Sequence, residues 1–132
     1  MNYINKKILE KQLFYDDVMI LKYHIEYPYI CNQMAQKFNR YNQTIAFNLK
    51  LKAENELYKE AIELYKYNKE NGYPVMVYEV YKTFESTFNS NNLVSLYFDE
   101  YIFSGRSTWK YNKNISNLEF KKRRNATSWI LF

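Results

Sequence analysis

The chain contains one histidine, His24, and one cysteine, Cys31, the side chains best suited to metal binding or nucleophilic chemistry. They are too few for a zinc site built from Cys and His ligands, and a lone cysteine cannot form an internal disulfide. His24 alternates with apolar residues, so we expect it on the polar face of a strand. We predict a surface histidine, a packed thiol at Cys31, and no catalytic, metal-binding or cofactor-binding residue.

Two pairs of adjacent carboxylates raise the question of a shared proton, as in paired-acid hydrolases. They are Asp16-Asp17 and Asp99-Glu100. Neighbouring residues in a strand point to opposite faces, so Asp99 and Glu100 are not expected to cooperate. Asp16 and Asp17 favour a turn. Neither pair predicts acid–base chemistry, and we expect the chain not to be an enzyme.

Tyrosine, which occurs 15 times, gives the best candidate for a binding surface. Its ring is apolar and its hydroxyl polar, a combination that suits glycan and protein interfaces. Asn, Lys, Ile and Tyr all have A/T-rich codons, so a biased genome is a sufficient explanation for the number alone. Six tyrosines on or beside predicted strands form the candidate partner-binding set, and half of them are expected to be core: Tyr27, Tyr29, Tyr78, Tyr81, Tyr97 and Tyr101.

The net charge of +5 would ordinarily suggest nucleic acid or an anionic membrane as a partner. Seven of the 19 basic residues but only one of the 14 acidic residues lie in 106–132, so residues 1–105 carry a net charge of −1. The body of the chain is therefore not basic, and no nucleic-acid partner is predicted. No signal peptide or membrane span is apparent, so localisation is unknown and cytoplasmic by default.

The spacing of apolar residues predicts the elements that position these side chains. Residues 3–15 and 18–27 read as two strands, the second ended by Pro28. Residues 32–71 repeat apolar side chains every three or four positions, which predicts a long amphipathic helix that ends at Asn71-Gly72. Residues 75–87 and 93–103 read as a second hairpin. The order β-β-α-β-β predicts an α+β fold, with the helix packed on a mainly antiparallel sheet.

Several short strings, in order, resemble the PdaC/RsiV-like domain of bacterial cell-envelope proteins, including Gram-positive ones. They are Tyr27-Pro28-Tyr29-Ile30, Phe38-Asn39, Gly72-Tyr73-Pro74, Tyr78-Glu79-Val80 and Val94-Ser95-Leu96-Tyr97. The resemblance covers roughly residues 15–105 and implies an incomplete α+β domain over residues 1–105.

The resemblance implies a non-catalytic binding or sensing module whose partner is cell-wall glycan or a lysozyme-like protein. The metal-holding Asp and two histidines of a polysaccharide deacetylase are not present as a motif, so the likeness is to an accessory domain. Two alternatives remain open: an intracellular structural or orphan domain without a ligand, and an accessory part of a peptidoglycan deacetylase.

Residues 106–132 depart from the family pattern, which continues after the fourth strand with Gly-Gly-Ala-His-Gly. Codons for Arg106 to Asn114, read from the second base, can spell Gly-Ala-His-Gly-Asn-Thr-Ile-Arg. We therefore predict that 106–132 is a non-family basic tail produced by a single-base slip, with a divergent natural tail as the alternative. A domain cut short there would leave 93–103 as an unpaired edge, so self-association through that strand is expected.

Overall fold

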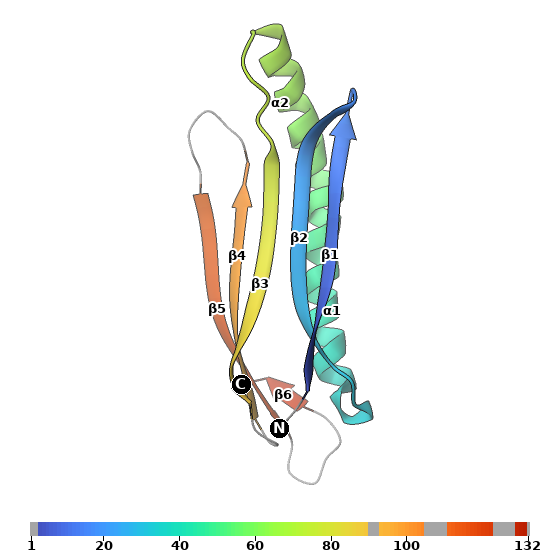
Figure 1. The fold of residues 1–132 in the computed structure, drawn as a ribbon, viewed down its shortest axis with the longest axis vertical. Coiled ribbons are helices and arrows are strands. Elements are labelled where there is room, and N and C mark those ends of the chain that lie inside the picture. Colours follow the sequence, from blue (N-terminus) through green and yellow to red (C-terminus); the bar gives the residue numbers. More distant parts are fainter. Residues whose placement is uncertain (1–2, 90–92, 105–110, 123–128, 132) are drawn as a thin grey trace.

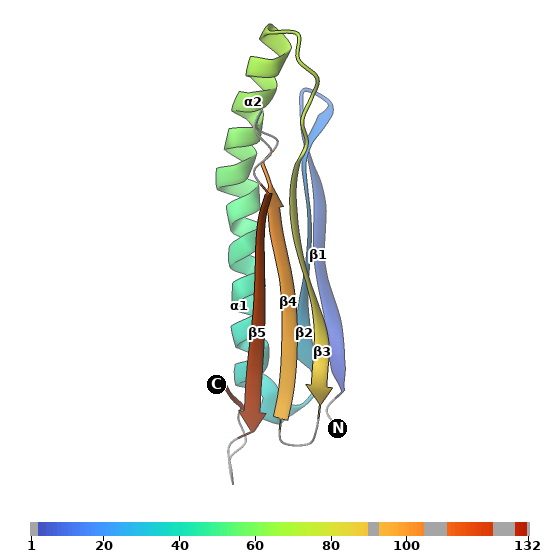
Figure 2. The same cartoon turned by 90° about the vertical axis from the view of Figure 1, so that its left-hand side faces the viewer.

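The computed structural model describes residues 3–89, 93–104, 111–122 and 129–131, with side chains for the first two ranges. The strands are β1 (Ile4–Tyr15), β2 (Val18–Ile30), β3 (Tyr78–Asn89), β4 (Leu93–Phe103), β5 (Tyr111–Lys122) and β6 (Trp129–Leu131). They form one sheet in sequence order. A long helical segment between β2 and β3 runs along one side of this sheet, behind β1 and β2 in Figure 1 and at the left in Figure 2. The predicted α+β class is confirmed.

The sheet is mainly antiparallel, as predicted, with one parallel pair. β2 and β3 are parallel because the helix returns the chain to the end of the sheet at which β2 began. Their pairing is short, running from Leu21 opposite Tyr78 to Ile25 opposite Lys82. This short junction joins the β1–β2 hairpin to the β3–β4 hairpin.

The helical segment has four parts. A 3-10 turn, η1 (Gln33–Ala35), leads into α1 (Gln36–Lys52), then a π-helical turn, η2 (Ala53–Leu57), and finally α2 (Tyr58–Glu70). The side chain of Asn32 accepts a hydrogen bond from the Met34 amide at the start. Gly72, with φ of 69°, follows the end of α2. The predicted helix is confirmed, whereas the π turn was not predicted.

The core has two parts along the molecule. The larger lies between β2, the start of β3 and the helix, and includes Leu21, Ile25, Ala53 and Val80. The smaller gathers side chains from β2, the start of the helix, β3 and β4: Ile30, Ala35, Phe38, Phe84, Val94, Leu96 and Phe98. Asn39 fixes the helix start to β2, because its side chain accepts from the Ile30 amide and donates to the Ile30 carbonyl, both at 2.8 Å.

The prediction that Pro28 ends the second strand is wrong. β2 continues to Ile30, with Pro28 opposite Lys6 of β1. The pairing of β2 with β3 stops at Ile25, so beyond that residue one side of β2 has no strand partner in the described chain. Proline is tolerated in such an edge because no ladder hydrogen bond is needed there.

The expectation of an open edge at residues 93–103 is also corrected. β5 pairs antiparallel with β4 over its whole length, from Leu93 opposite Lys121 to Phe103 opposite Tyr111. Self-association through 93–103 would therefore require β5 to move away, and it stays a prediction. The origin of residues 106–132 is a separate question, which backbone pairing does not address.

Candidate functional site

Four side chains from four adjacent strands lie in one row across the sheet. The register places Glu10 of β1 opposite His24 of β2, His24 opposite Tyr81 of β3, and Tyr81 opposite Tyr101 of β4. Alternation along β3 puts Tyr81 on the face opposite Tyr78 and Val80, which are buried against the helix. The Glu10–Tyr101 row therefore lies on the sheet face that the helix leaves uncovered.

His24 is held between two carboxylates. Its Nδ1 lies 2.8 Å from Oε2 of Glu10, and its Nε2 lies 2.8 Å from Oε2 of Glu26. The hydrogen bond to Glu26 raises the pKa of His24, and the bond to Glu10 adds to this against the opposing effect of burial. The protonated ring can donate from both nitrogens at once. Each ring nitrogen is thus occupied by a carboxylate, which leaves neither available as a base.

Glu26 is the buried member of this arrangement, with 8% of its surface exposed. Burial alone would raise its pKa, but hydrogen bonds from His24 and Lys6 outweigh burial and lower it. The Lys6 Nζ lies 3.2 Å from Oε1 of Glu26. The cluster therefore favours the charged form of a buried carboxylate, which His24 and Lys6 contact.

The tyrosine half of the row is a stacked pair. The rings of Tyr81 and Tyr101 are 5.0 Å apart between centroids with an angle of 15° between their planes. The imidazole of His24 lies 6.0 Å from the Tyr81 ring. An open hollow of about 410 Å³ adjoins the row, lined by Glu10, Lys11, Gln12, Lys22, Tyr23, His24 and Tyr81. Most of these side chains are polar, so the hollow offers many hydrogen-bond donors and acceptors.

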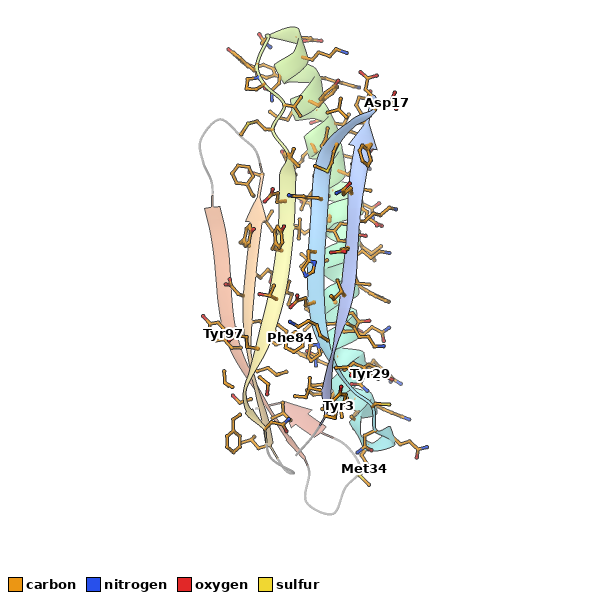
Figure 3. All side chains as sticks on the ribbon, in the orientation of Figure 1. Tyr3, Asp17, Tyr29, Met34, Phe84 and Tyr97 are labelled. Atoms are coloured by element: carbon orange, nitrogen blue, oxygen red, sulfur yellow. The ribbon has the colours of Figure 1, made fainter. Side chains whose placement is uncertain are left out.

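The six candidate tyrosines separate into three groups. Tyr27 and Tyr78 are core residues, with 8% and 1% of their surfaces exposed. Tyr81, Tyr97 and Tyr101 are half-buried on β3 and β4, and alternation puts all three on the uncovered face. Tyr29 lies elsewhere, on β2, with the Lys7 amine 5.1 Å from its ring centroid. Figure 3 shows Tyr29 and Tyr97 on different strands and well separated.

The remaining candidates lie apart from this row. Cys31 is exposed directly after β2, so the prediction of a packed thiol is wrong. Asp99 faces Thr83 and Glu100 faces Lys82, on opposite faces as predicted. Within the described residues, no group of three or more His, Cys, Asp or Glu side chains is arranged so that it could hold a metal ion. No described helix is both long and apolar enough to cross a membrane.

Asp16 forms a second polar cluster at the far end of the first hairpin. Its carboxylate accepts from Lys69 Nζ at 3.1 Å and from the Tyr65 hydroxyl at 3.2 Å. The hydrogen bond from Lys69 lowers the pKa of Asp16, and the same contact raises that of Lys69. Asp16 and Asp17 both have positive φ, 56° and 62°, which fits the tight two-residue turn predicted for them. This cluster fixes the turn to α2, and its polar groups form hydrogen bonds with one another.

Sequence reasoning missed Glu10, Glu26 and Lys6 as members of the site. His24 and Glu26 stand two residues apart in one strand, which already places them on the same face. That spacing was the signal for their contact. Glu10 and Lys6 belong to the neighbouring strand, and placing them requires the register of the hairpin.

Comparison with known proteins identifies the family. A family model described as deacetylase PdaC matches residues 16–107. A crystal structure of a DUF3298 family member from Bacteroides fragilis NCTC 9343 has a TM-score of 0.58 at 11% identity, which shows likeness of fold. The match covers 88% of this chain but only 55% of that one. No curated protein matched. Because the family model covers well over half of its residues, this chain belongs to the deacetylase PdaC family.

Proposed function

We propose that the chain is a non-catalytic module that binds cell-wall glycan through the Glu10–Tyr101 row. The observation that carries the proposal is the row itself, in which a carboxylate, an imidazole and two stacked phenols lie side by side on the uncovered face. The resemblance to domains of bacterial cell-envelope proteins, together with the match to the deacetylase PdaC family, supports a ligand in the cell wall.

The chemistry of the row suits sugar hydroxyls, which both donate and accept hydrogen bonds. Phenolic hydroxyls do the same, carboxylates accept, and a protonated imidazole or Lys22 donates. The rings of Tyr81 and Tyr101 add apolar surface for the carbon side of a sugar. The open, polar hollow beside the row fits an extended chain better than a small apolar ligand, which needs an enclosed pocket.

The state of the titratable side chains supports a binding role. Catalysis by His24 would need a free ring nitrogen, and both nitrogens are held by carboxylates. Lys82, a buried lysine of β3, has 8% of its surface exposed and lies on the helix side of the sheet, with its amine 5.0 Å from the centroid of the Phe98 ring. Burial lowers the pKa of Lys82, but its position keeps it away from the uncovered face.

Co-sedimentation of the purified chain with insoluble peptidoglycan tests the proposal. We expect the double substitution Tyr81→Ala, Tyr101→Ala to weaken binding about tenfold or more, because each ring loses its apolar and polar contacts. The matched control is Tyr67→Ala, Tyr73→Ala. These rings also form a pair, 6.1 Å apart, but they are exposed at the end of α2. Circular dichroism establishes that both variants fold.

A parallel measurement with immobilised lysozyme separates glycan from protein as the ligand. Binding to peptidoglycan that depends on Tyr81 and Tyr101 supports the proposal. Tyrosine-dependent binding to lysozyme without binding to peptidoglycan would assign the row to a protein partner. Equal binding of the two double variants, or no binding at all, would also contradict the proposal.

A further inference from the structure

β1 is the long free edge of the sheet. It pairs with β2 on one side, and no strand in the described part of the chain lies on its other side. In Figures 1 and 2 β1 lies at the margin of the sheet. Every second residue of an edge strand directs its amide and carbonyl away from the sheet, so 12 residues offer a template for another strand.

Lysines often protect such an edge from pairing with another strand, but the lysines of β1 contact side chains of their own molecule. Lys6 pairs with Glu26 at 3.2 Å, and Lys7 lies over the Tyr29 ring at 5.1 Å. Lys11 approaches Glu54 of the helix at 3.9 Å. At the middle of the free edge, Ile8 is 50% exposed. The edge therefore combines unshielded backbone with an exposed apolar side chain.

We propose that β1 pairs with β1 of a second copy, antiparallel, about a two-fold axis at Ile8. Facing residues of an antiparallel pair lie on the same face of the sheet, so the axis must pass through a residue and not between two. An axis at Ile8 puts the two Ile8 side chains together. It also puts Lys6 of each copy opposite Glu10 of the other, which gives two pairs of opposite charge.

The neighbouring registers of a β1–β1 pair would place like charges opposite each other. An axis at Leu9 sets Lys7 opposite Lys11, and an axis at Lys7 or Glu10 sets identical charges against each other. Like charges directly opposite in a sheet are destabilising. Lys6 and Glu10 also retain exposure, so each can face a second copy while holding its internal partner. The charge pattern thus selects a second copy of this chain and one register.

Disulfide trapping tests the register directly. In a Cys31→Ser background, we expect Ile8→Cys to form a disulfide-linked dimer under mild oxidation, because residues facing each other at the axis lie within disulfide range. Gln12→Cys is the matched control on the same strand and face. Two such residues would be eight strand positions apart, roughly 27 Å, and cannot be bridged. Linkage at residue 12 and not at residue 8, or at neither, would overturn the proposal.

Charge reversal tests the partner contacts, with light scattering after size exclusion as the readout. Lys6→Glu alone and Glu10→Lys alone each place like charges opposite each other twice, and we expect each to weaken dimerisation about tenfold or more. An equimolar mixture of the two variants restores both opposite pairs, so heterodimers should form. Monomers in the mixture, or a wild-type chain that is monomeric at millimolar concentration, would refute the pairing.

Discussion

His24 shows how a side chain that looks like an ordinary surface residue can be the centre of a polar cluster. It stands on the uncovered face of β2, as its alternation predicts, but the side chain is only 24% exposed. Glu10 of β1 and Glu26 of β2 each contact one ring nitrogen of His24, and Lys6 of β1 forms an ion pair with Glu26. The cluster thereby fixes the orientation of the His24 ring in the row that continues with Tyr81 and Tyr101.

The pH dependence of stability reports on this cluster. The folded pKa of His24 lies above its ordinary value of 6.5, so its contribution is present below that pH and is lost as pH rises through the folded pKa. The folded pKa of Glu26 lies below 4.5, so its contribution is present above that pH and is lost on acidification. Both contributions coexist between about pH 4.5 and 6.5.

We therefore expect the melting temperature to fall between pH 6 and pH 9, and His24→Gln to remove most of that fall. The comparison with His24→Gln is essential because burial lowers the pKa of Lys82, so the contribution of Lys82 makes the protein more stable as the pH rises. Thermal denaturation of both proteins across this range makes the measurement. If the melting temperature depends on pH in the same way in both proteins, the protonation of His24 does not contribute to stability.

Glu10 illustrates the limit of sequence reasoning at this scale. Near the turn, facing residues of β1 and β2 have numbers that sum to 33, as Tyr15 and Val18 do, but from Leu13 back to Ile4 the sum is 34. A bulge between Leu13 and Phe14 makes the change. Without it, Glu10 would face Tyr23, which points into the core. One irregular residue therefore decides which face the row occupies, and alternation alone does not predict a bulge.

At the scale of elements, the helix contains the clearest signal that was overlooked. From Leu49 onward, the buried hydrophobic residues of the helix in the larger core recur at intervals of four: Leu49, Ala53, Leu57, Ala61 and Tyr65. An α-helix turns about 100° per residue, so each step of four over-rotates by about 40°. Four such steps would carry Tyr65 almost to the opposite side. The π turn at Ala53–Leu57 accommodates an extra residue and removes about 100° of this drift.

Inserting one Ala directly after Asn55, an exposed residue of the π turn, should therefore destabilise the protein. The π turn already accommodates one extra residue, so a further one would rotate α2 by about 100° relative to α1. Ala61 and Tyr65 would leave the core and Lys69 would lose Asp16, at a cost of about 3–5 kcal/mol. Chemical denaturation measures the loss.

Asn55→Ala is the control for this insertion. The substitution keeps the number of residues and removes only an exposed side chain, so the free energy of unfolding should change by less than about 0.5 kcal/mol. An insertion variant as stable as this control would show that the number of residues in the π turn does not set the orientation of α2.

At the scale of the whole molecule, local patterns predicted the class, the helix and both hairpins, and β4 has the predicted limits. They did not predict the parallel junction of β2 and β3, which depends on the path of the helix between them. They also did not predict the pairing of β5 with β4. The family model ends at residue 107, close to the predicted departure after Gly105, so β5 lies in the segment outside that match.

The single-base slip predicted for residues 106–132 has a measurable consequence for stability. We expect a chain that continues after Gly105 with Gly-Ala-His-Gly-Asn-Thr-Ile-Arg and the rest of the alternative frame to melt at least about 5 °C higher than the chain with its present residues 106–132. If the slip occurred, the alternative frame would supply the continuation that the resemblance implies, and each further apolar side chain it buries would contribute about 1.5–3 kcal/mol. A chain with residues 106–132 in scrambled order is the control. Equal melting temperatures for the present chain and the alternative-frame chain would contradict the slip. Genomic DNA with an uninterrupted frame across Ser104 to Trp109 would also contradict it, and a divergent natural tail would then be the explanation.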